Sequence, residues 1–366
     1  MKIAQVSHPG VRVPPIKYGG AELVIANLIN GLVNRGHQVT LFGTKDSATK
    51  AQRVISFTDK PLGLGTESVT SVDNRMVAAL TLFRAYQLAD QFDIVHWHVS
   101  HDLWPVMLAS IIPQKSVVTF HNFFTSDKLD DFFKLFKDVT CNISISESFR
   151  RKIPLKFQAV VHNGINIREL SFSPKGGNYI SWLGRFSPVK GTHFVIKVAQ
   201  RLKKVVKLAA PPPQVPKQEM YFKKEIRPHL RSKNVQYIGE VDTNQKSNLL
   251  QSSRVFLNPI QWDEAFGLVV PEANACGTPV IAYARGSMPE LIKDGVNGFL
   301  VKPNDLEGMI KLTEKIYQMP EDKYRAMRRA CRQHVEENFT VEKMVDGYER
   351  VYEKVIADFK SKNPKS

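Results

Sequence analysis

Short apolar runs alternate with amphipathic stretches along the first half of the chain, and this alternation predicts a parallel sheet wrapped by helices. Residues 21–34 carry Val24, Leu28 and Leu32 at four-residue spacing, which predicts a helix, and Gly36 suits its exit before the next strand. The apolar runs predict strands at residues 2–7, 38–43, 94–98, 117–120 and 141–145.

A second alternating series predicts another Rossmann-like unit, with strands at residues 179–183, 235–238, 255–258, 280–282 and 298–301. Between the two series, residues 166–178 have the serine, proline and glycine content of a linker. The final stretch, residues 341–360, gathers apolar side chains on one face and predicts a helix. Because 366 residues exceed one typical core, we expect two domains that meet at this linker.

The composition, with 43% hydrophobic and 23% charged residues, is typical of a soluble globular protein. The first residues lack the apolar region of a signal peptide, and no apolar run reaches membrane-spanning length, so we expect a cytoplasmic protein. Cys141, Cys276 and Cys331 are too scattered to predict a disulfide framework or a zinc cage. The net charge of +16 favours anionic partners: nucleotides, acidic lipids or nucleic acid. Nucleic acid is the weaker of these predictions, because the sequence has no recognition-helix motif or zinc-finger spacing.

The segment from Glu264 to Glu290 contains the candidate chemistry. Pro271 suits the first position of a helix, which would place Glu272 in the first turn, where its carboxylate can face a ligand. Free backbone N–H groups at such a helix end can bind a phosphate, so the combination suits a ribose diphosphate. The alternative is an ordinary loop followed by a helix and a buried strand at residues 279–282.

This segment resembles the donor-site signature of the retaining family-4 glycosyltransferases, in which two glutamates are separated by seven residues. The resemblance implies that Glu264 and the following backbone of Phe266, Gly267 and Leu268 lie against the transferred sugar. It implies that Glu272 binds the ribose hydroxyls. The chain departs from the family pattern at Ala265, Pro271 and Ala210, where the family often has proline, a hydrophobic residue and glycine.

Other stretches resemble the same family in the expected order, at residues 14–22, 36–42, 161–165 and 183–191. The resemblance implies an α/β GT-B fold, in which two Rossmann-like doubly wound domains face a central cleft. The N-terminal domain, residues 1–170, would be the acceptor side, and residues 171–340 would bind the nucleotide-sugar donor. The C-terminal helix, within residues 341–366, would cross back to the first domain.

Transfer of a glycosyl group requires a leaving diphosphate to be stabilised, by a metal or by fixed cations. Arg185 and Lys190 follow a predicted strand, and the resemblance implies that they contact the diphosphate; otherwise they are solvated cations. The resemblance also places Gly19 and Gly20 beside the sugar phosphate, although an isolated Gly-Gly is more often a turn. His121 matches a family histidine beside the donor sugar, and its alternative is a strand-end histidine with satisfied hydrogen bonds.

The predicted catalytic set is therefore His121, Arg185, Lys190 and Glu264. The predicted donor-binding set is Gly19, Gly20, Arg185, Lys190, Glu264, Phe266, Gly267, Leu268 and Glu272. His96, His98 and His101 are candidate metal ligands, with His96 and His98 on one strand face. No local carboxylate or cysteine completes that set, and the resembled fold needs no metal or other cofactor.

The acceptor side has an aromatic and basic stretch whose meaning stays open. It contains Phe123, Phe124, Phe132, Phe133 and Phe136 with Lys128, Lys134 and Lys137. One interpretation is peripheral contact with an anionic membrane at its inner face or with a lipid-linked acceptor, and the other is a helix that packs its phenylalanines on the sheet.

The prediction for function is a retaining, metal-independent glycosyltransferase that moves a sugar from a nucleotide diphosphate sugar to a glycan or glycolipid. Retention is expected through departure and attack on the same face, with Glu264 orienting the sugar instead of acting as a nucleophile. Two alternatives remain. One is a nucleotide-sugar epimerase of the same architecture, and the other is a non-catalytic basic protein that binds nucleotides or nucleic acid.

Overall fold

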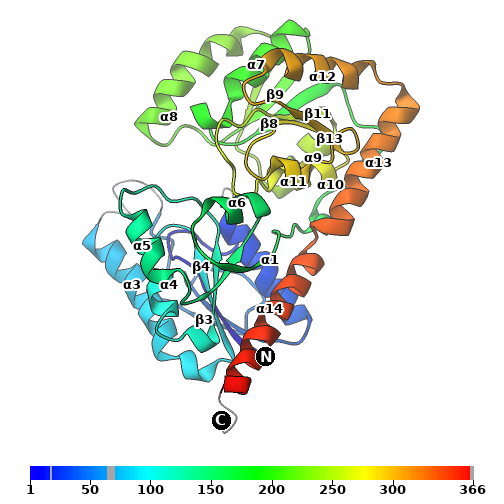
Figure 1. Ribbon diagram of the computed structural model, residues 1–366. Helices are drawn as coiled ribbons and strands as arrows, with labels where there is room; N and C mark the ends of the chain where they lie inside the picture. Colours follow the sequence, from blue (N-terminus) through cyan, green and yellow to red (C-terminus); the bar gives the residue numbers. More distant parts are fainter. Residues whose placement is uncertain (17–18, 64–70, 363–366) are drawn as a thin grey trace. The chain divides into compact units, whose positions relative to one another are not determined.

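The computed structural model describes the chain except residues 17–18, 64–70 and 363–366 (Figure 1). Its contacts divide into two compact units, each of which is a parallel sheet with helices. Unit 1 comprises Met1–Gly164 together with Val341–Ser366, and unit 2 comprises Ile165–Thr340.

The sheet of unit 1 has seven strands in the order β3-β2-β1-β4-β5-β6-β7, and every pair is parallel. Ile3 in the interior strand β1 lies opposite both Val39 and Ile94, and all three are buried. The strands are β1 (Lys2–Val6), β2 (Gln38–Phe42), β3 (Arg53–Ile55), β4 (Ile94–Val99), β5 (Ser116–Phe120), β6 (Cys141–Ser144) and β7 (Phe157–Val160).

The five strands predicted in this half are confirmed, whereas β3 and β7 were missed. Both missed strands lie at the edges of the sheet, where only one neighbour pairs with the backbone and the side chains stay partly exposed. An edge strand needs no continuous apolar run, so its sequence gives a weak pattern.

Six described α-helices belong to unit 1. The predicted helix at residues 21–34 is confirmed as α1, and Gly36 leaves it with a φ of +85°. The helices are α1 (Gly20–Asn34), α3 (Val72–Gln87), α4 (Trp104–Ala109), α5 (Leu129–Phe136), α6 (Glu147–Lys152) and α14 (Val341–Lys362), with 3-10 turns η1 (Ala89–Gln91) and η2 (Pro113–Lys115).

The last helix, α14, packs on unit 1 beside α1 (Figure 1). Its predicted apolar face is confirmed, because Met344, Val345, Tyr348 and Tyr352 are all buried. Gly31 of α1 makes the close approach possible, since a Cβ there would lie 2.5 Å from a methyl carbon of Val345.

Unit 2 has a six-stranded parallel sheet in the order β10-β9-β8-β11-β12-β13. Its strands are β8 (Tyr179–Leu183), β9 (Val206–Ala209), β10 (Val235–Gly239), β11 (Ser253–Asn258), β12 (Val280–Tyr283) and β13 (Gly298–Val301). Only β9 was missed, because it follows Lys203 and Lys204 and carries Lys207, which lies over the ring of Tyr179 instead of in the core.

The helices of unit 2 cover both the sheet and the loops between its strands. They are α7 (Thr192–Arg201), α8 (Pro216–Tyr221), α9 (Thr243–Gln251), α10 (Val269–Ala275), α11 (Met288–Leu291), α12 (Leu306–Gln318) and α13 (Glu321–Asn338). The 3-10 segments are η3 (Ile167–Glu169), η4 (Pro188–Lys190) and η6 (Arg227–Arg231), and η5 (Phe222–Ile226) is a π-helical segment that follows α8.

The segment with linker composition is bound to unit 2. Arg328 of α13 is fully buried and donates hydrogen bonds to the carbonyls of Ser173, Gln251, Ser253 and Cys276. Those carbonyls come from three separate segments, since Gln251 and Ser253 both lie at the junction of α9 and β11, so a single guanidinium joins the start of unit 2 to its sheet.

Each sheet reverses its strand order once, between β1 and β4 in unit 1 and between β8 and β11 in unit 2. In doubly wound sheets ligands bind outside the carboxyl ends of the strands at this point. The loops that follow these four strands are therefore where each unit is expected to bind ligand. None of the helices that the structure describes is both long and apolar enough to cross a bilayer.

Candidate active site

In unit 2, the loops that follow β8 and β11 meet at the reversal of strand order. Backbone N–H of Gln261 donates to the carbonyl of Val189 over 2.7 Å, which ties one loop to the other. Gly191 has a φ of +68° and turns the chain from η4 into α7. Lys190 is thereby placed with its Nζ 2.5 Å from Oε2 of Glu264. The structure thus brings together two predicted site residues that are 74 positions apart in the sequence.

Glu264 is held by more than this ion pair. Trp262 Nε1 donates to the same carboxylate oxygen over 3.3 Å, and Lys190 lies 5.5 Å from the centre of the Trp262 ring. The Glu264 carbonyl also accepts from the backbone of Ser287 over 3.1 Å. Because its side chain is 16% exposed, the carboxylate has a defined direction and still reaches the surface.

Gly286 permits this arrangement because its backbone, with a φ of +55°, lies against the backbone of Glu264. A Cβ at Gly286 would overlap the Glu264 nitrogen and carbonyl oxygen. We expect Gly286→Ala to destabilise the protein by about 2–4 kcal/mol, the range of backbone overpacking and strain. Urea unfolding measures this loss.

The matched control is Gly295→Ala. Gly295 also has a positive φ, +76°, but a Cβ there meets nothing within 4 Å. This variant carries the backbone strain alone, about 1 kcal/mol. Equal losses in the two variants would contradict the close approach at Glu264.

Glu272 forms a second ion pair, which the sequence did not suggest. Its Oε1 lies 2.5 Å from Nζ of Lys246, a residue of α9, and both side chains are largely buried, at 7% and 16% exposed. A capping box between Asp242 and Gln245 begins α9 and so sets the turn that carries Lys246. Lys246 and Glu272 are 26 positions apart, which explains why no local pattern predicted the contact.

The helix that carries Glu272 begins earlier than predicted. α10 starts at Val269, so Pro271 is its third residue, and the prediction that Pro271 is the first helical residue is wrong. Proline is tolerated there because the backbone nitrogens of the first turn need no partner within the helix. Glu272 still lies in the first turn, as predicted.

The remaining donor residues predicted in unit 2 follow the same strands. Phe266 is buried, and its carbonyl accepts from the hydroxyl of Ser287. Gly267 has a φ of +88°, and Leu268 caps α10. Arg185 is exposed on the loop after β8. The backbone of residues 266–268 thus begins two residues after Glu264, the partner of Lys190.

In unit 1, three histidines follow the carboxyl ends of β1, β4 and β5: His8, His101 and His121. His101 Nε2 lies 3.2 Å from Oε1 of Glu22, which comes from the first turn of α1 and is buried. Burial would raise the pKa of Glu22, but the hydrogen bond and charge of His101 outweigh it and lower that pKa. A Cβ at Gly19 would lie 3.1 Å from the other Glu22 oxygen, so this glycine also borders the cluster.

His121 continues into a buried hydrogen-bonded chain. Its Nε2 lies 2.9 Å from Nδ1 of His98, and Nε2 of His98 lies 2.7 Å from the side-chain oxygen of Gln5. Gln5 donates to the hydroxyl of Tyr352 over 3.1 Å, and that hydroxyl lies 2.7 Å from Nδ1 of His96. Burial lowers the pKa of His121 to about 4 and holds the pKa values of His96 and His98 well below the usual value. All three rings are therefore neutral at pH 7.

The hydrogen-bond partners of His96, His98 and His101 bear on whether these residues bind a metal ion. His96 and His98 share a strand face as predicted, with ring centres 4.1 Å apart. Both nitrogens of each ring are within hydrogen-bond distance of a protein partner, and His101 contacts Glu22 instead. Over the described part of the chain, no group of three or more His, Cys, Asp or Glu side chains is placed to hold a metal ion.

The aromatic and basic stretch lies partly in α5. Phe133 is buried, which agrees with packing on the unit, whereas Leu135 is 71% exposed. Contact with a membrane stays a prediction.

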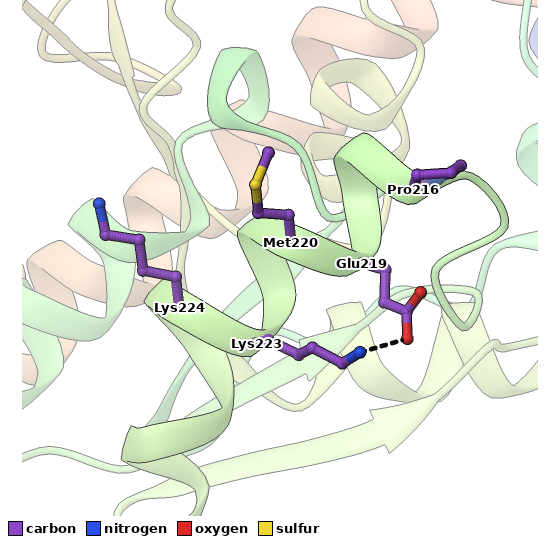
Figure 2. A pocket seen from close by; sticks show the side chains of 5 residues that line it. All are labelled: Pro216, Glu219, Met220, Lys223 and Lys224. Atoms are coloured by element: carbon purple, nitrogen blue, oxygen red, sulfur yellow. Dashed lines mark ion pairs between the residues drawn. The ribbon is translucent and has the colours of Figure 1, made fainter.

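Two surface hollows lie outside these sites. One lies on α8 and η5 of unit 2, where Pro216, Glu219, Met220, Lys223 and Lys224 line it (Figure 2). Glu219 and Lys223 point toward each other there and form an ion pair of 2.7 Å. The other, of about 680 Å³, lies between β7 and α14 of unit 1. Neither hollow contains a predicted site residue.

Comparison with known proteins agrees with this architecture. The sequence profile of the glycosyl transferases group 1 matches residues 165–334, and that of glycosyltransferase family 4 matches residues 18–169. The O-antigen chain mannosyltransferase C of Escherichia coli is 23% identical in an alignment 366 positions long, gaps included, that covers 92% of this chain and 95% of that protein.

Two solved structures share the fold of the chain. Sucrose-phosphate synthase of Thermosynechococcus elongatus matches with a TM-score of 0.78 at 19% identity, over 98% of this chain and 99% of that one. HepE of Anabaena, solved with UDP, matches with a TM-score of 0.73 at 20% identity, over 97% and 100%.

The two parallel sheets and these matches define the class of the protein as an α/β glycosyltransferase of the GT-B fold, as predicted. The two profiles match successive parts of the chain and together extend from residue 18 to residue 334. The chain belongs to the family-4 glycosyltransferases.

Proposed function

We propose that this glycosyltransferase uses a nucleotide diphosphate sugar and transfers the sugar with retention to a glycan or glycolipid, without a metal ion. The observation that carries the proposal is the pairing of two carboxylates with two lysines in unit 2, where Lys190 and Glu264 lie on the loops after β8 and β11 and Lys246 and Glu272 lie in α9 and α10. Lys190 pairs with Glu264 and Lys246 with Glu272, each over 2.5 Å.

The proposed roles follow from the chemistry of these groups. Lys190, with Arg185, stabilises the negative charge that develops on the leaving diphosphate, because fixed cations do so without reorganising. Glu264 accepts hydrogen bonds from sugar hydroxyls, with the backbone of residues 266–268 beside it. Glu272 accepts from the ribose hydroxyls, and Lys246 fixes the direction of its carboxylate.

The names of the relatives support the proposed classes of sugar donor and acceptor. The relative in Escherichia coli is named for mannosyl transfer to the O-antigen chain, and the HepE structure contains UDP. These names support a glycan acceptor and a nucleotide-sugar donor for this chain. In unit 1, His121, Gly19 and Gly20 are proposed to contact the donor sugar and its phosphate.

Thermal unfolding with UDP, GDP, ADP and CMP, alone and as sugar conjugates, tests the donor site. A ligand that binds the folded state raises the melting temperature by mass action. We expect one nucleoside diphosphate and its sugar to raise it selectively, and transfer from that sugar to persist in EDTA. Retention is then read from the anomeric configuration of the product by NMR. If none of the nucleotides raises the melting temperature, the proposed donor site is wrong.

A further inference from the structure

We propose that His98 and Gln5 are positioning residues that hold His121 as the tautomer protonated on Nε2, so that Nδ1 accepts a hydrogen bond from a sugar hydroxyl. The hydroxyl as the donor rests on the proposed function; the tautomer rests on the geometry of unit 1 alone.

The Gln5 amide gives the chain its direction. Its nitrogen donates to the hydroxyl of Tyr352 over 3.1 Å, so its oxygen is the atom that faces Nε2 of His98 over 2.7 Å. An amide oxygen can only accept a hydrogen bond, and therefore Nε2 of His98 must carry hydrogen. Tyr352 then donates its own proton to Nδ1 of His96, 2.7 Å away.

The direction passes from His98 to His121. A neutral imidazole has one N–H, so Nδ1 of His98 is an acceptor once Nε2 is protonated. The atom that faces it over 2.9 Å is Nε2 of His121, which must therefore be the donor. His121 is neutral at pH 7 because burial lowers its pKa to about 4, which leaves Nδ1 without a proton.

The Nδ1 atom of His121 is the last atom of this series of hydrogen bonds. His121 is 5% exposed, and within the part of the chain that the structure describes its Nδ1 is a buried atom with no hydrogen-bond partner. Buried polar atoms without a partner are rare in folded proteins, and each requires an explanation. A neutral nitrogen that accepts a hydrogen bond suits a hydroxyl group that donates one, and the sugar substrate of a glycosyltransferase has several hydroxyl groups.

A half-turn of the Gln5 side-chain amide would reverse the direction of every hydrogen bond in this series. If the Gln5 amide turned by half a rotation, its nitrogen would donate to His98, and the proton would be on Nδ1 of His121 instead. Nδ1 could then only donate. The packing of His96 against His98, with ring centres 4.1 Å apart, and the contact of His96 with Thr119 over 2.8 Å hold the rings in place, so the amide decides the tautomer.

The tautomer can be measured on the wild-type full chain labelled with ¹⁵N-histidine. Two-bond ¹H–¹⁵N correlations distinguish the two neutral tautomers, and His121→Ala assigns the signals by their loss. We expect His121 to carry its proton on Nε2, with a shift of the Nδ1 resonance when the nucleotide sugar binds. A proton on Nδ1 would overturn the proposal without any measurement of activity.

His98→Leu removes the acceptor for His121 Nε2, and His98→Asn supplies an amide oxygen in its place. We expect His98→Leu to shift the tautomer and lower kcat by about 10- to 100-fold, the loss typical when an orienting partner is removed, with KM for the donor changed much less. His98→Asn should restore most of the wild-type tautomer of His121 and most of kcat. The control His229→Leu alters a histidine of η6 outside the chain of bonds and should change neither.

The outcomes separate this inference from the proposed function. If His98→Leu leaves the tautomer of His121 or kcat unchanged, His98 is not a positioning residue. If the tautomer is as expected but His121→Ala transfers sugar normally, the tautomer assignment stands and the proposed role of His121 fails. Should His98→Leu not fold, the wild-type spectrum still decides the tautomer.

Discussion

Lys190→Ala is expected to lower kcat/KM for the nucleotide sugar by about 100- to 1,000-fold, the usual effect of removing one group that stabilises developing charge. Lys190 lies on the loop after β8 and contacts Glu264 over 2.5 Å, so under the proposed function its loss removes a cation from the diphosphate and frees the carboxylate proposed to orient the sugar. Steady-state kinetics with the donor found by thermal unfolding measure this change, and calorimetry gives the affinity for the nucleoside diphosphate.

The control for Lys190 is Lys223→Ala, which removes the same charge and also breaks a lysine–glutamate pair (Figure 2). That pair is more than half exposed on both sides, so solvent screens it and we expect its loss to change neither stability nor transfer appreciably. For Lys190→Ala we expect a similarly small change in the free energy of unfolding, because Trp262 still donates to Glu264. Unchanged nucleotide affinity would reject the phosphate role.

Glu272→Ala is expected to weaken the binding of ribose nucleotides by about 10- to 100-fold, because hydrogen bonds to a charged acceptor are worth about 1.5–3 kcal/mol. The carboxylate is 7% exposed and is held by Lys246, so its direction is defined before any ligand binds. Affinity for inorganic pyrophosphate, which has no ribose, should change little. Isothermal titration with both ligands measures the difference.

A 2′-deoxynucleoside diphosphate sharpens this test. Wild-type protein should bind the 2′-deoxy nucleotide more weakly than the ribose nucleotide. The Glu272→Ala variant should no longer distinguish ribose from deoxyribose, since the effects of two changes on binding free energy are not additive when the changed groups are in contact. Glu219→Ala, which removes an exposed carboxylate from the control pair, should behave as wild type. An equal loss for pyrophosphate and nucleotide would argue against a ribose role for Glu272.

Much of the architecture was predictable because burial imposes a pattern on the sequence. Strands such as β1, β4 and β11 are buried on both faces over nearly their whole length and contain short apolar stretches, such as residues 3–4, 94–95 and 255–257, and α14 shows one apolar face. The strands that were missed are β3, β7 and β9. The first two are edge strands, and the third has a lysine that lies over Tyr179 at the surface of the sheet.

The candidate site was predictable only in part. The resemblance indicated Lys190 and Glu264, and the loop geometry places them in contact. Lys246 and Trp262 had no motif of their own, and the start of α10 was predicted two residues late because Pro271 also fits the third position of a helix.

The sequence alone determined ten of the thirteen strands, the first and last helices, and where two charged motifs follow strands, because side-chain period and residue type are local properties. Only the tertiary structure decided which charged groups meet, since that depends on the order of strands in each sheet. Lys246 reaches Glu272 because α9 and α10 pack together, and Tyr352 reaches Gln5 across 347 residues because α14 packs on unit 1. The tautomer of His121 follows from that packing, because each hydrogen bond in a buried chain fixes the direction of the next.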